Sequence, residues 1–370
     1  MTLINYMSRV HFADGVLEVA LSAELELNRL SRPVLISDEG MADSEFSERV
    51  STGMPFWCEF TSTQLLRAAS RQDSITALKQ TALSHRADVL IAYGSALSLR
   101  IADACRREMQ AHNRSGASDL SPALFAIPGV DGLPALASLT PGSRFSKLSR
   151  QGIQPTTVII DPTLIIGESA QRTASAAANT LARCLSACFS SGYNPPADGI
   201  ALDGYKRIVR HLKEIVATDS LEMRRELMAA SLNGTLAMEK EPGIAHHLCH
   251  HLIRNLPDVD EGSLMRVLIV VEAQMMEHSW DKARMNELCR TLEVPENQQL
   301  SQWLIGVLSK LPLPGSLKEM NIAEPVISAA VDEVTTQKAA AIPSARRLVN
   351  VLNTVDFNNF DQPVRSTCTH

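Results

Sequence analysis

The segment that decides the fold is Asp88-Val-Leu-Ile-Ala-Tyr93, which runs directly into Gly94-Ser95 and then into a helix-forming stretch over 97–110. A short apolar run that ends at a turn residue is typical of a buried strand followed by a tight turn. Pro33-Val-Leu-Ile-Ser37 repeats the pattern, with helical spacing before and after it. This alternation of strands and helices predicts βαβ units and therefore a parallel sheet.

Outward from this segment the chain divides into two halves. Further strands are expected at 9–12, 124–128 and 157–161, whereas an Ala-rich helix is expected at 172–190 and only helical patterns follow from residue 200. Periodicity of this kind separates a sheet-containing region from a helical one. We predict an α/β domain with a Rossmann-like parallel sheet at 1–163, an all-helical domain at 164–355 and a tail at 356–370.

The composition narrows the possible classes of function. A chain of 370 residues with 45% apolar and 21% charged residues is long enough for two domains with proper cores. Its net charge of −6 offers no basic surplus for nucleic acid or an anionic membrane. The first residues lack the pattern of a signal peptide, and the seven cysteines contain no C-x-x-C pair. We expect a cytoplasmic protein that acts on a small molecule.

Four of the ten histidines gather in the stretch Ala245-His246-His247-Leu248-Cys249-His250-His251-Leu252. On a helix, residues four apart share one face, so this spacing places His246 beside His250 and His247 beside His251. Such a pair can bind a metal or line a polar site, or it can belong to a solvated helix face. The other components of a site must come from elsewhere in the chain.

Several short stretches, in this order, resemble the iron-containing alcohol dehydrogenase and dehydroquinate synthase-like superfamily, and most of all maleylacetate reductase. The resemblance implies an N-terminal dinucleotide-binding domain, a helical C-terminal domain and, in relatives of this kind, dimers. A homodimer is therefore expected from the resemblance. The matching stretches are Tyr6–Phe12, Asp88–Gly94, Ala126–Pro128, Leu139–Arg144 with Pro155–Pro162, Ala178–Arg183 with Asn194-Pro195, and His246–His250.

The cofactor motifs depart from the family pattern. The resemblance implies a Gly-Gly-Gly-Ser turn at which backbone N–H groups approach the dinucleotide phosphates. Here the turn is Gly94-Ser95-Ala96-Leu97, and the helix after it carries Asp103 where the family usually has Lys. The second loop, Pro128–Pro134, lacks the family's hydroxyl donors. We therefore expect no cofactor, with Gly94 and Ser95 as vestiges of its site, although NAD(P)H remains the cofactor under the reductase alternative.

The metal motif departs as well. Metal-using relatives present Asp and His one helical turn apart, followed by two more histidines. In this chain the resemblance aligns these positions with Asn179, Arg183, His246 and Asp258. A guanidinium repels a divalent cation and cannot be deprotonated to become a ligand. We predict no metal.

These residues suggest chemistry at a carbonyl group in the cleft between the domains. Arg183 would hold a carboxylate or stabilise an enolate, Asn179 would donate to a carbonyl oxygen, and His246 or His250 would transfer protons, with Asp258 nearby. The first hypothesis is thus a non-redox enzyme that catalyses cyclisation, dehydration or isomerisation. The alternatives are an NAD(P)H-dependent reductase of a maleylacetate-like keto acid and a catalytically inactive homologue in which Arg183 and Asp258 form a salt bridge.

Overall fold

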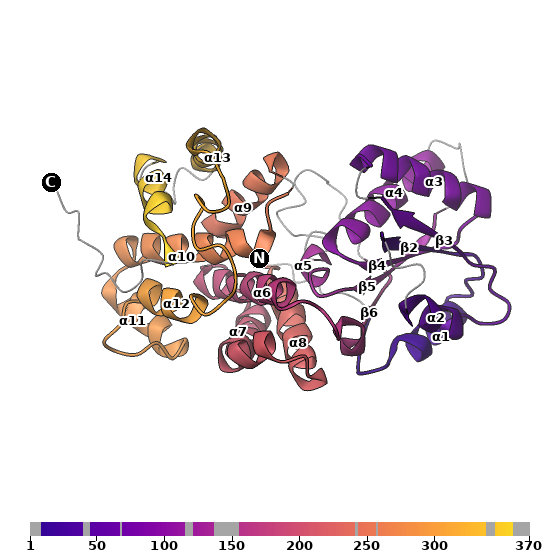
Figure 1. Cartoon of the computed structure of the whole chain (residues 1–370), viewed down its shortest axis with the longest axis horizontal. Helices are drawn as coiled ribbons and strands as arrows, with labels where there is room; N and C mark the ends of the chain where they lie inside the picture. The colour runs from indigo at the N-terminus through magenta and orange to yellow at the C-terminus, as the bar shows by residue number, and fades with distance from the viewer. Residues whose placement is uncertain are drawn as a thin grey trace.

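The structure is a computed structural model that describes residues 9–39, 45–66, 69–114, 121–136, 155–240, 243–256, 258–337 and 345–357. In Figure 1 the α/β part lies on the right and the helical part on the left. The sequence matches at Tyr6–Ser8 and Leu139–Arg144 lie outside the described residues, as does most of the predicted tail.

The α/β part is built on a six-stranded sheet with the order β1-β6-β5-β4-β2-β3, and every pairing is parallel. Helices α1 (Leu17–Leu27) and α2 (Glu45–Gly53) cover one face, and α3 (Arg71–His85) and α4 (Ala96–Arg114) cover the other (Figure 1). Both faces are apolar, as a covered parallel sheet requires. The strands are β1 (Val10–Phe12), β2 (Pro33–Asp38), β3 (Thr61–Leu65), β4 (Val89–Gly94), β5 (Ala123–Pro128) and β6 (Thr157–Ile160).

The strand order reverses between β2 and β4. The chain leaves β2 toward β3 at one edge of the sheet, whereas it leaves β4 toward β5 in the opposite direction. In open parallel sheets, ligands bind outside the carboxyl ends of the strands at such a reversal. Asp38 is the last residue of β2 and Gly94 the last of β4, so these two residues mark this position. We call it the switch point.

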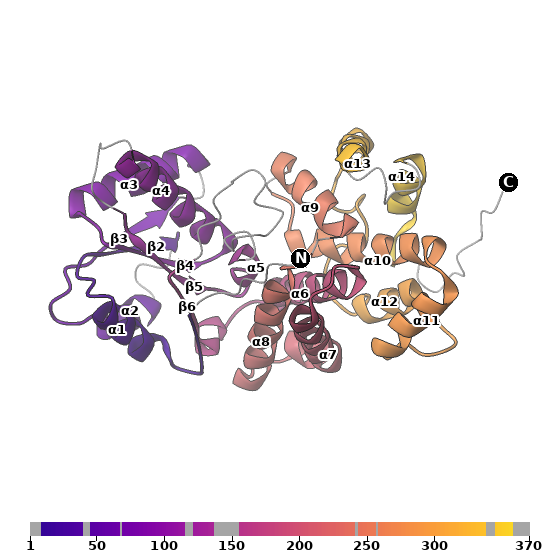
Figure 2. The ribbon, with the colours of Figure 1, turned by 180° about the vertical axis from the view of Figure 1, so that it is seen from behind.

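Helix α6 (Ala170–Phe189) is the centre of the helical part, and every residue from Thr173 to Ala187 is buried. Its alanines and serines let α7, α8 and α10 pack closely around it (Figure 2). The remaining helices are α5 (Leu133–Leu136), the short 3-10 helix η2 (Pro162–Ile165), α7 (Pro195–Ala217), α8 (Leu221–Ala237), α9 (Ile244–Asn255), α10 (Glu261–Ser279), α11 (Lys282–Thr291), α12 (Leu300–Leu308), α13 (Glu324–Gln337) and α14 (Ala345–Thr354).

Polar side chains join the two parts where they meet, and we call this region the seam. Arg225 Nε donates to Asp14 Oδ1 over 3.1 Å, and Thr235 Oγ1 donates to the carbonyl of Leu133 over 3.1 Å. Two further ion pairs cross the seam, Arg172 with Asp131 and Arg100 with Glu261. Charged and polar contacts thus cross the seam beside the apolar core that the two parts share.

The predicted fold class is confirmed, because a parallel Rossmann-like sheet is followed, in the part of the chain that the structure describes, by helices alone. One strand was missed: no strand was predicted between 37 and 88, whereas 61–65 forms β3 and α3 begins at Arg71. β3 lies at the sheet edge, and its Thr-Ser-Thr-Gln-Leu sequence is mostly polar and only partly buried, so it lacks the apolar run of an inner strand. The domain limits at 163 and 355 stay a prediction.

Within the described ranges, no helix combines the length and the hydropathy that crossing a bilayer requires.

Candidate functional site

The turn after β4 has a backbone that only glycine adopts readily. Gly94 has φ +108°, in the left-handed region. A Cβ atom at this position would also overlap the carboxylate of Asp38. The close approach of β2 and β4 at the switch point therefore requires glycine at residue 94.

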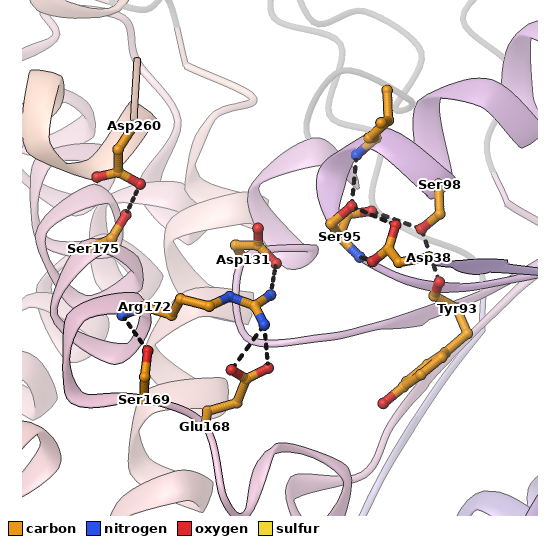
Figure 3. A network of polar contacts seen from close by, with 11 residues as sticks. Asp38, Tyr93, Ser95, Ser98, Asp131, Glu168, Ser169, Arg172, Ser175 and Asp260 are labelled. Atoms are coloured by element: carbon orange, nitrogen blue, oxygen red, sulfur yellow. Dashed lines mark hydrogen bonds and ion pairs between the residues drawn. The ribbon is translucent and has the colours of Figure 1, made fainter. Parts of the chain in front are cut away.

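Ser95 folds back onto Asp38 (Figure 3). Its backbone N–H donates to Asp38 Oδ2 over 2.7 Å and its hydroxyl donates to Oδ1 over 2.8 Å. The same hydroxyl accepts from the N–H of Leu97 over 3.2 Å and so caps the start of α4. The hydroxyl of Ser95 is therefore turned toward β2.

Asp103 does not lie at the helix start. It sits two turns into α4, is 1% exposed and is ion-paired with Arg107. Burial raises the pKa of Asp103 to about 6, against the lowering effect of Arg107 and Arg106. The expectation that Asp103 faces a diphosphate is therefore not supported.

An ion pair forms where α6 meets α10. Arg183 Nη2 donates to Glu261 Oε1 over 3.0 Å, and Arg183 Nε donates to Asn179 Oδ1 over 3.1 Å. Asn179 Nδ2 completes the triangle by donating to Glu261 Oε1 over 3.2 Å. The side chain of Arg183 is 7% exposed and that of Glu261 is 24% exposed. Asn179 and Arg183 meet as the sequence predicted, with a carboxylate that the prediction did not include.

A second guanidinium faces the same carboxylate from across the seam. Arg100 of α4 lies 3.6 Å from Glu261 Oε2. Burial raises the pKa of Glu261, but the attraction of Arg183 and Arg100 outweighs that effect and the net shift is downward. Glu261 is therefore ionised near neutral pH. Two guanidiniums surround one carboxylate, which gives this group a net charge of +1.

His246 is buried on α9 and held by a hydrogen-bond chain. The hydroxyl of Ser186 donates to Glu272 Oε2 over 3.3 Å and lies 3.0 Å from His246 Nδ1. We assign the proton of His246 to Nδ1 from this network, which leaves the lone pair on Nε2. Burial, with smaller effects of Arg183 and His247, lowers the pKa of His246 well below its usual value. His246 is therefore a neutral ring of fixed orientation.

His250 lies one turn further along α9 and is exposed. Partial removal from water lowers its pKa, and the positive charges of Arg254 and Arg100 add to this effect. His250 is thus also neutral near pH 7, but unlike His246 it exchanges protons with solvent directly. Its pKa also responds to Glu261. We call Asn179, Arg183, Glu261, Arg100, His246 and His250 the charged cluster.

Asp258 does not belong to this cluster. It is exposed in the connection between α9 and α10, and Glu261 takes the place expected for it beside Arg183. Asp260 caps α10, accepting from Ser263 N over 2.7 Å and from Ser175 Oγ over 2.7 Å. A Cβ atom at Gly262 would overlap the carbonyl of Ser175, so α10 packs directly on α6. The Glu-Gly pair at the start of a helix was the signal that the sequence analysis missed.

Iron is implied by the family resemblance, but the residues present do not fit a metal. Arg183 stands among the side chains that would bind it, and a guanidinium repels a cation and offers no lone pair. Glu261 already accepts from both Asn179 and Arg183. Across the described ranges, no three His, Cys, Asp or Glu side chains are grouped as metal ligands. No step of the chemistry below is assigned to a metal.

A second ionic group, also absent from the sequence analysis, crosses the seam near the switch point (Figure 3). Arg172 Nη1 donates to both carboxylate oxygens of Glu168 over 2.9 Å, and Arg172 Nη2 lies 3.3 Å from Asp131 Oδ1. Burial raises the pKa of both acids against the lowering effect of Arg172. This group ties the loop after β5 to the start of α6.

Comparisons with known proteins identify relatives that are named as dehydrogenases. No protein-family model matches the chain. It is 24% identical to a 4-hydroxybutyrate dehydrogenase of Cupriavidus necator, over 94% of this chain and 99% of that protein. Over 31% of this chain and 30% of the relative, it is 34% identical to a 1,3-propanediol dehydrogenase of Klebsiella pneumoniae.

Two solved structures share the fold at low sequence identity. Sulfoacetaldehyde reductase from Bifidobacterium kashiwanohense, solved with NAD+, has a TM-score of 0.80 at 16% identity, with 96% of this chain and 100% of that chain covered. Maleylacetate reductase from Agrobacterium tumefaciens has a TM-score of 0.73 at 17% identity, with coverages of 95% and 97%.

The predicted resemblance to iron-containing alcohol dehydrogenases is confirmed, since solved enzymes of that name share this fold. Two other predictions are wrong. A non-redox cyclase, lyase or isomerase was expected, whereas the relatives are dehydrogenases and reductases. No cofactor was expected, whereas one relative binds NAD+ in its solved structure. The error was to equate lost glycines with a lost phosphate turn, since Gly94 has φ +108° and α4 begins directly after the turn.

Proposed function

We propose that this chain, which has the fold of the iron-containing alcohol dehydrogenases, is an NAD-dependent enzyme that interconverts a small carbonyl compound bearing an acid group and the corresponding alcohol. The observation that carries the proposal is the ion pair between Arg100 and Glu261. Arg100 lies in the second turn of the helix that starts at the switch point, and Glu261 belongs to the charged cluster. A dinucleotide at the switch point and a substrate at the cluster would therefore be neighbours.

The switch point fits a dinucleotide. The first turn of α4 offers backbone N–H groups and the positive end of a helix dipole to a pyrophosphate. Asp38, at the end of β2, would accept hydrogen bonds from ribose hydroxyls in addition to those from Ser95, and its charge would oppose the 2′-phosphate of NADP. We therefore favour NAD over NADP. When bound, the nicotinamide supplies or accepts the hydride.

The charged cluster fits an anionic substrate. Its two guanidiniums exceed its one carboxylate by a single positive charge; the side chain of Arg183 is buried, where attraction is weakly screened, whereas that of Arg100 is 38% exposed. The relatives named for 4-hydroxybutyrate, maleylacetate and sulfoacetaldehyde act on compounds that carry an acid group. This agreement supports a short keto or aldehyde acid as the substrate of this chain.

His250 is our candidate for the proton donor. A neutral imidazole donates one N–H, and the exposed position of His250 allows solvent to replace the proton. His246 is too deeply buried for that role, so we assign it to positioning. Asn179 orients Arg183.

The test is a fluorescence titration with NADH and NADPH, followed by NADH oxidation with 4-oxobutanoate and with butanal as the uncharged control. We expect micromolar NADH affinity, weaker NADPH binding and a kcat/KM at least tenfold higher for the acid. If neither dinucleotide saturates the protein at millimolar concentration, the proposal fails. Tight NADH binding without turnover of any short carbonyl compound would instead indicate an inactive homologue.

A further inference from the structure

We infer that the guanidinium of Arg183 does the work assigned to the metal in metal-using relatives: it binds the oxygen of the reacting carbonyl group, and the protein needs no metal. The claim about the carbonyl oxygen rests on the proposed function. The claim that the site excludes a metal does not, because it concerns only the residues of the cluster.

Some N–H groups of the Arg183 guanidinium are not used in contacts within the protein, and their direction is fixed. Its Nε is committed to Asn179 and its Nη2 to Glu261. Within the residues that the structure describes, Nη1 has no hydrogen-bond partner; the side chain is only 7% exposed, but Nη1 itself is not fully buried. An incoming ligand oxygen can therefore replace water on this donor. The two bonds that are formed fix the plane of the guanidinium, so the direction of the remaining N–H groups is set before a ligand arrives.

A donor held in this way is suited to an oxygen that gains negative charge. Hydrogen bonds from charged donors are stronger than those between neutral groups, and fixed donors need no reorganisation as the charge develops. When hydride adds to the carbonyl carbon, the electron pair of the C=O bond moves to the oxygen held by Arg183. A proton passed from solvent through His250 then completes the hydroxyl group.

The cluster also preserves the overall charge of a metal site. A divalent cation with the one Asp and three His of the family pattern has a net charge of +1. Arg183 and Arg100 with Glu261 sum to the same charge, Asn179 and His246 are neutral, and Glu272 lies behind Ser186 in the hydrogen-bond chain of His246. The guanidinium of Arg183 thus offers a positive charge to a developing oxyanion in place of the cation.

The decisive experiment rebuilds the ligands of the family pattern. The variant Asn179→Asp/Arg183→His/Glu261→His, together with His246, offers one Asp and three His. Metal content is measured by mass spectrometry after loading with Zn²⁺ and desalting, and melting temperature is measured with and without EDTA. The single variants Arg183→His and Glu261→His serve as matched controls, since each leaves an incomplete set.

We expect the wild-type protein to retain less than about 0.1 equivalent of Zn²⁺ and to melt at the same temperature in EDTA. The triple variant should retain about one equivalent, and EDTA should lower its melting temperature. One equivalent in the wild-type protein that the single variant Glu261→His loses would overturn the inference. A folded triple variant that retains no metal would show that the cluster is not arranged as a ligand set and would overturn it equally.

If the triple variant does not fold, Arg183→Lys decides the matter. Lysine keeps the charge but cannot bond Asn179, Glu261 and a carbonyl oxygen in one plane. We expect kcat to fall at least 100-fold with the NADH dissociation constant within threefold of the wild type. Unchanged kcat would overturn the role of Arg183. If the wild-type protein does not bind NADH, the proposed function is contradicted. The measurement of metal content would still test whether the site excludes a metal.

Discussion

The switch point and the charged cluster diverge from the family pattern in opposite ways. At the switch point the residue types have changed, yet Gly94 keeps φ +108° and α4 still begins directly after it. In the cluster two aligned positions on α6 carry Asn179 and Arg183 in place of metal ligands, and Glu261 of α10, which the alignment did not include, completes the group. A ligand bound by backbone N–H groups tolerates changes of residue type as long as the backbone is kept. A ligand bound by side chains does not.

The variant Arg183→Gln gives the most sensitive test of this difference between the switch point and the charged cluster. Glutamine is uncharged and shorter, so the charged donor to a substrate oxygen and the ionic partner of Glu261 are lost. Removing one oxyanion donor costs about 10²–10³ in kcat. We expect a loss of that size in steady-state assays with 4-oxobutanoate, with NADH affinity unchanged. A loss below tenfold would contradict the role of Arg183 in the cluster.

Gly262→Ala perturbs the cluster without altering any charged side chain. The new Cβ atom would overlap the carbonyl of Ser175 and push the start of α10 away from α6. Overpacking of this kind costs about 1–3 kcal/mol, measured as the free energy of unfolding in urea. Gly199→Ala is the control, because nothing lies within 4 Å of a Cβ atom there. Equal stability of the two variants would contradict the tight contact between α6 and α10.

Asp38→Asn tests the switch point. The amide removes the charge that we expect to select ribose hydroxyls over a 2′-phosphate. NADH binding should weaken about tenfold, which is roughly 1.4 kcal/mol, and the preference for NADH over NADPH should shrink. Fluorescence titration with both dinucleotides measures this. Unchanged affinities for both would place the adenosine ribose elsewhere.

Asp103→Asn should have the smallest effect on binding and a distinct effect on stability. The folded-state pKa of about 6 lies above the usual 3.8, so the folded protein holds this proton more tightly than the unfolded chain. The resulting stability is complete below a pH of about 4 and is lost as the pH rises through about 6. The variant should therefore lose less stability than the wild type between those values in urea unfolding. Its NADH affinity should stay within twofold, since Asp103 is buried away from the switch point; markedly tighter binding would contradict that location.

Most of the fold was predictable because its signals are local. Apolar runs such as Val89–Tyr93 mark inner strands, and helical periodicity marked the helices of the C-terminal half. β3 was not predicted because this edge strand is stabilised by its pairing with β2, which is a non-local contact. Polar residues such as those of Thr61–Gln64 give no sign of that pairing in the sequence.

The candidate site was predictable only where helical spacing determined it. Asn179 and Arg183 are one turn apart on α6, and their contact follows from that spacing. Glu261 reaches them because Gly262 lets α10 lie against α6, which no spacing within one helix reveals. Asp258 was chosen because the resemblance aligns it with a metal ligand, but it lies exposed between α9 and α10. The role of each cluster residue in the reaction stays a proposal.

The burial of α6 has a consequence for how this protein can change. Every residue from Thr173 to Ala187 is enclosed, so most substitutions along the helix would have to be accompanied by repacking of its neighbours. Asn179 and Arg183 are among the few α6 residues whose polar groups lie in the charged cluster and do not pack against neighbouring helices. Laboratory evolution of this scaffold toward new substrates should therefore accumulate its productive mutations at the ends of such side chains and on α4 and α9, while α6 is inherited almost unaltered.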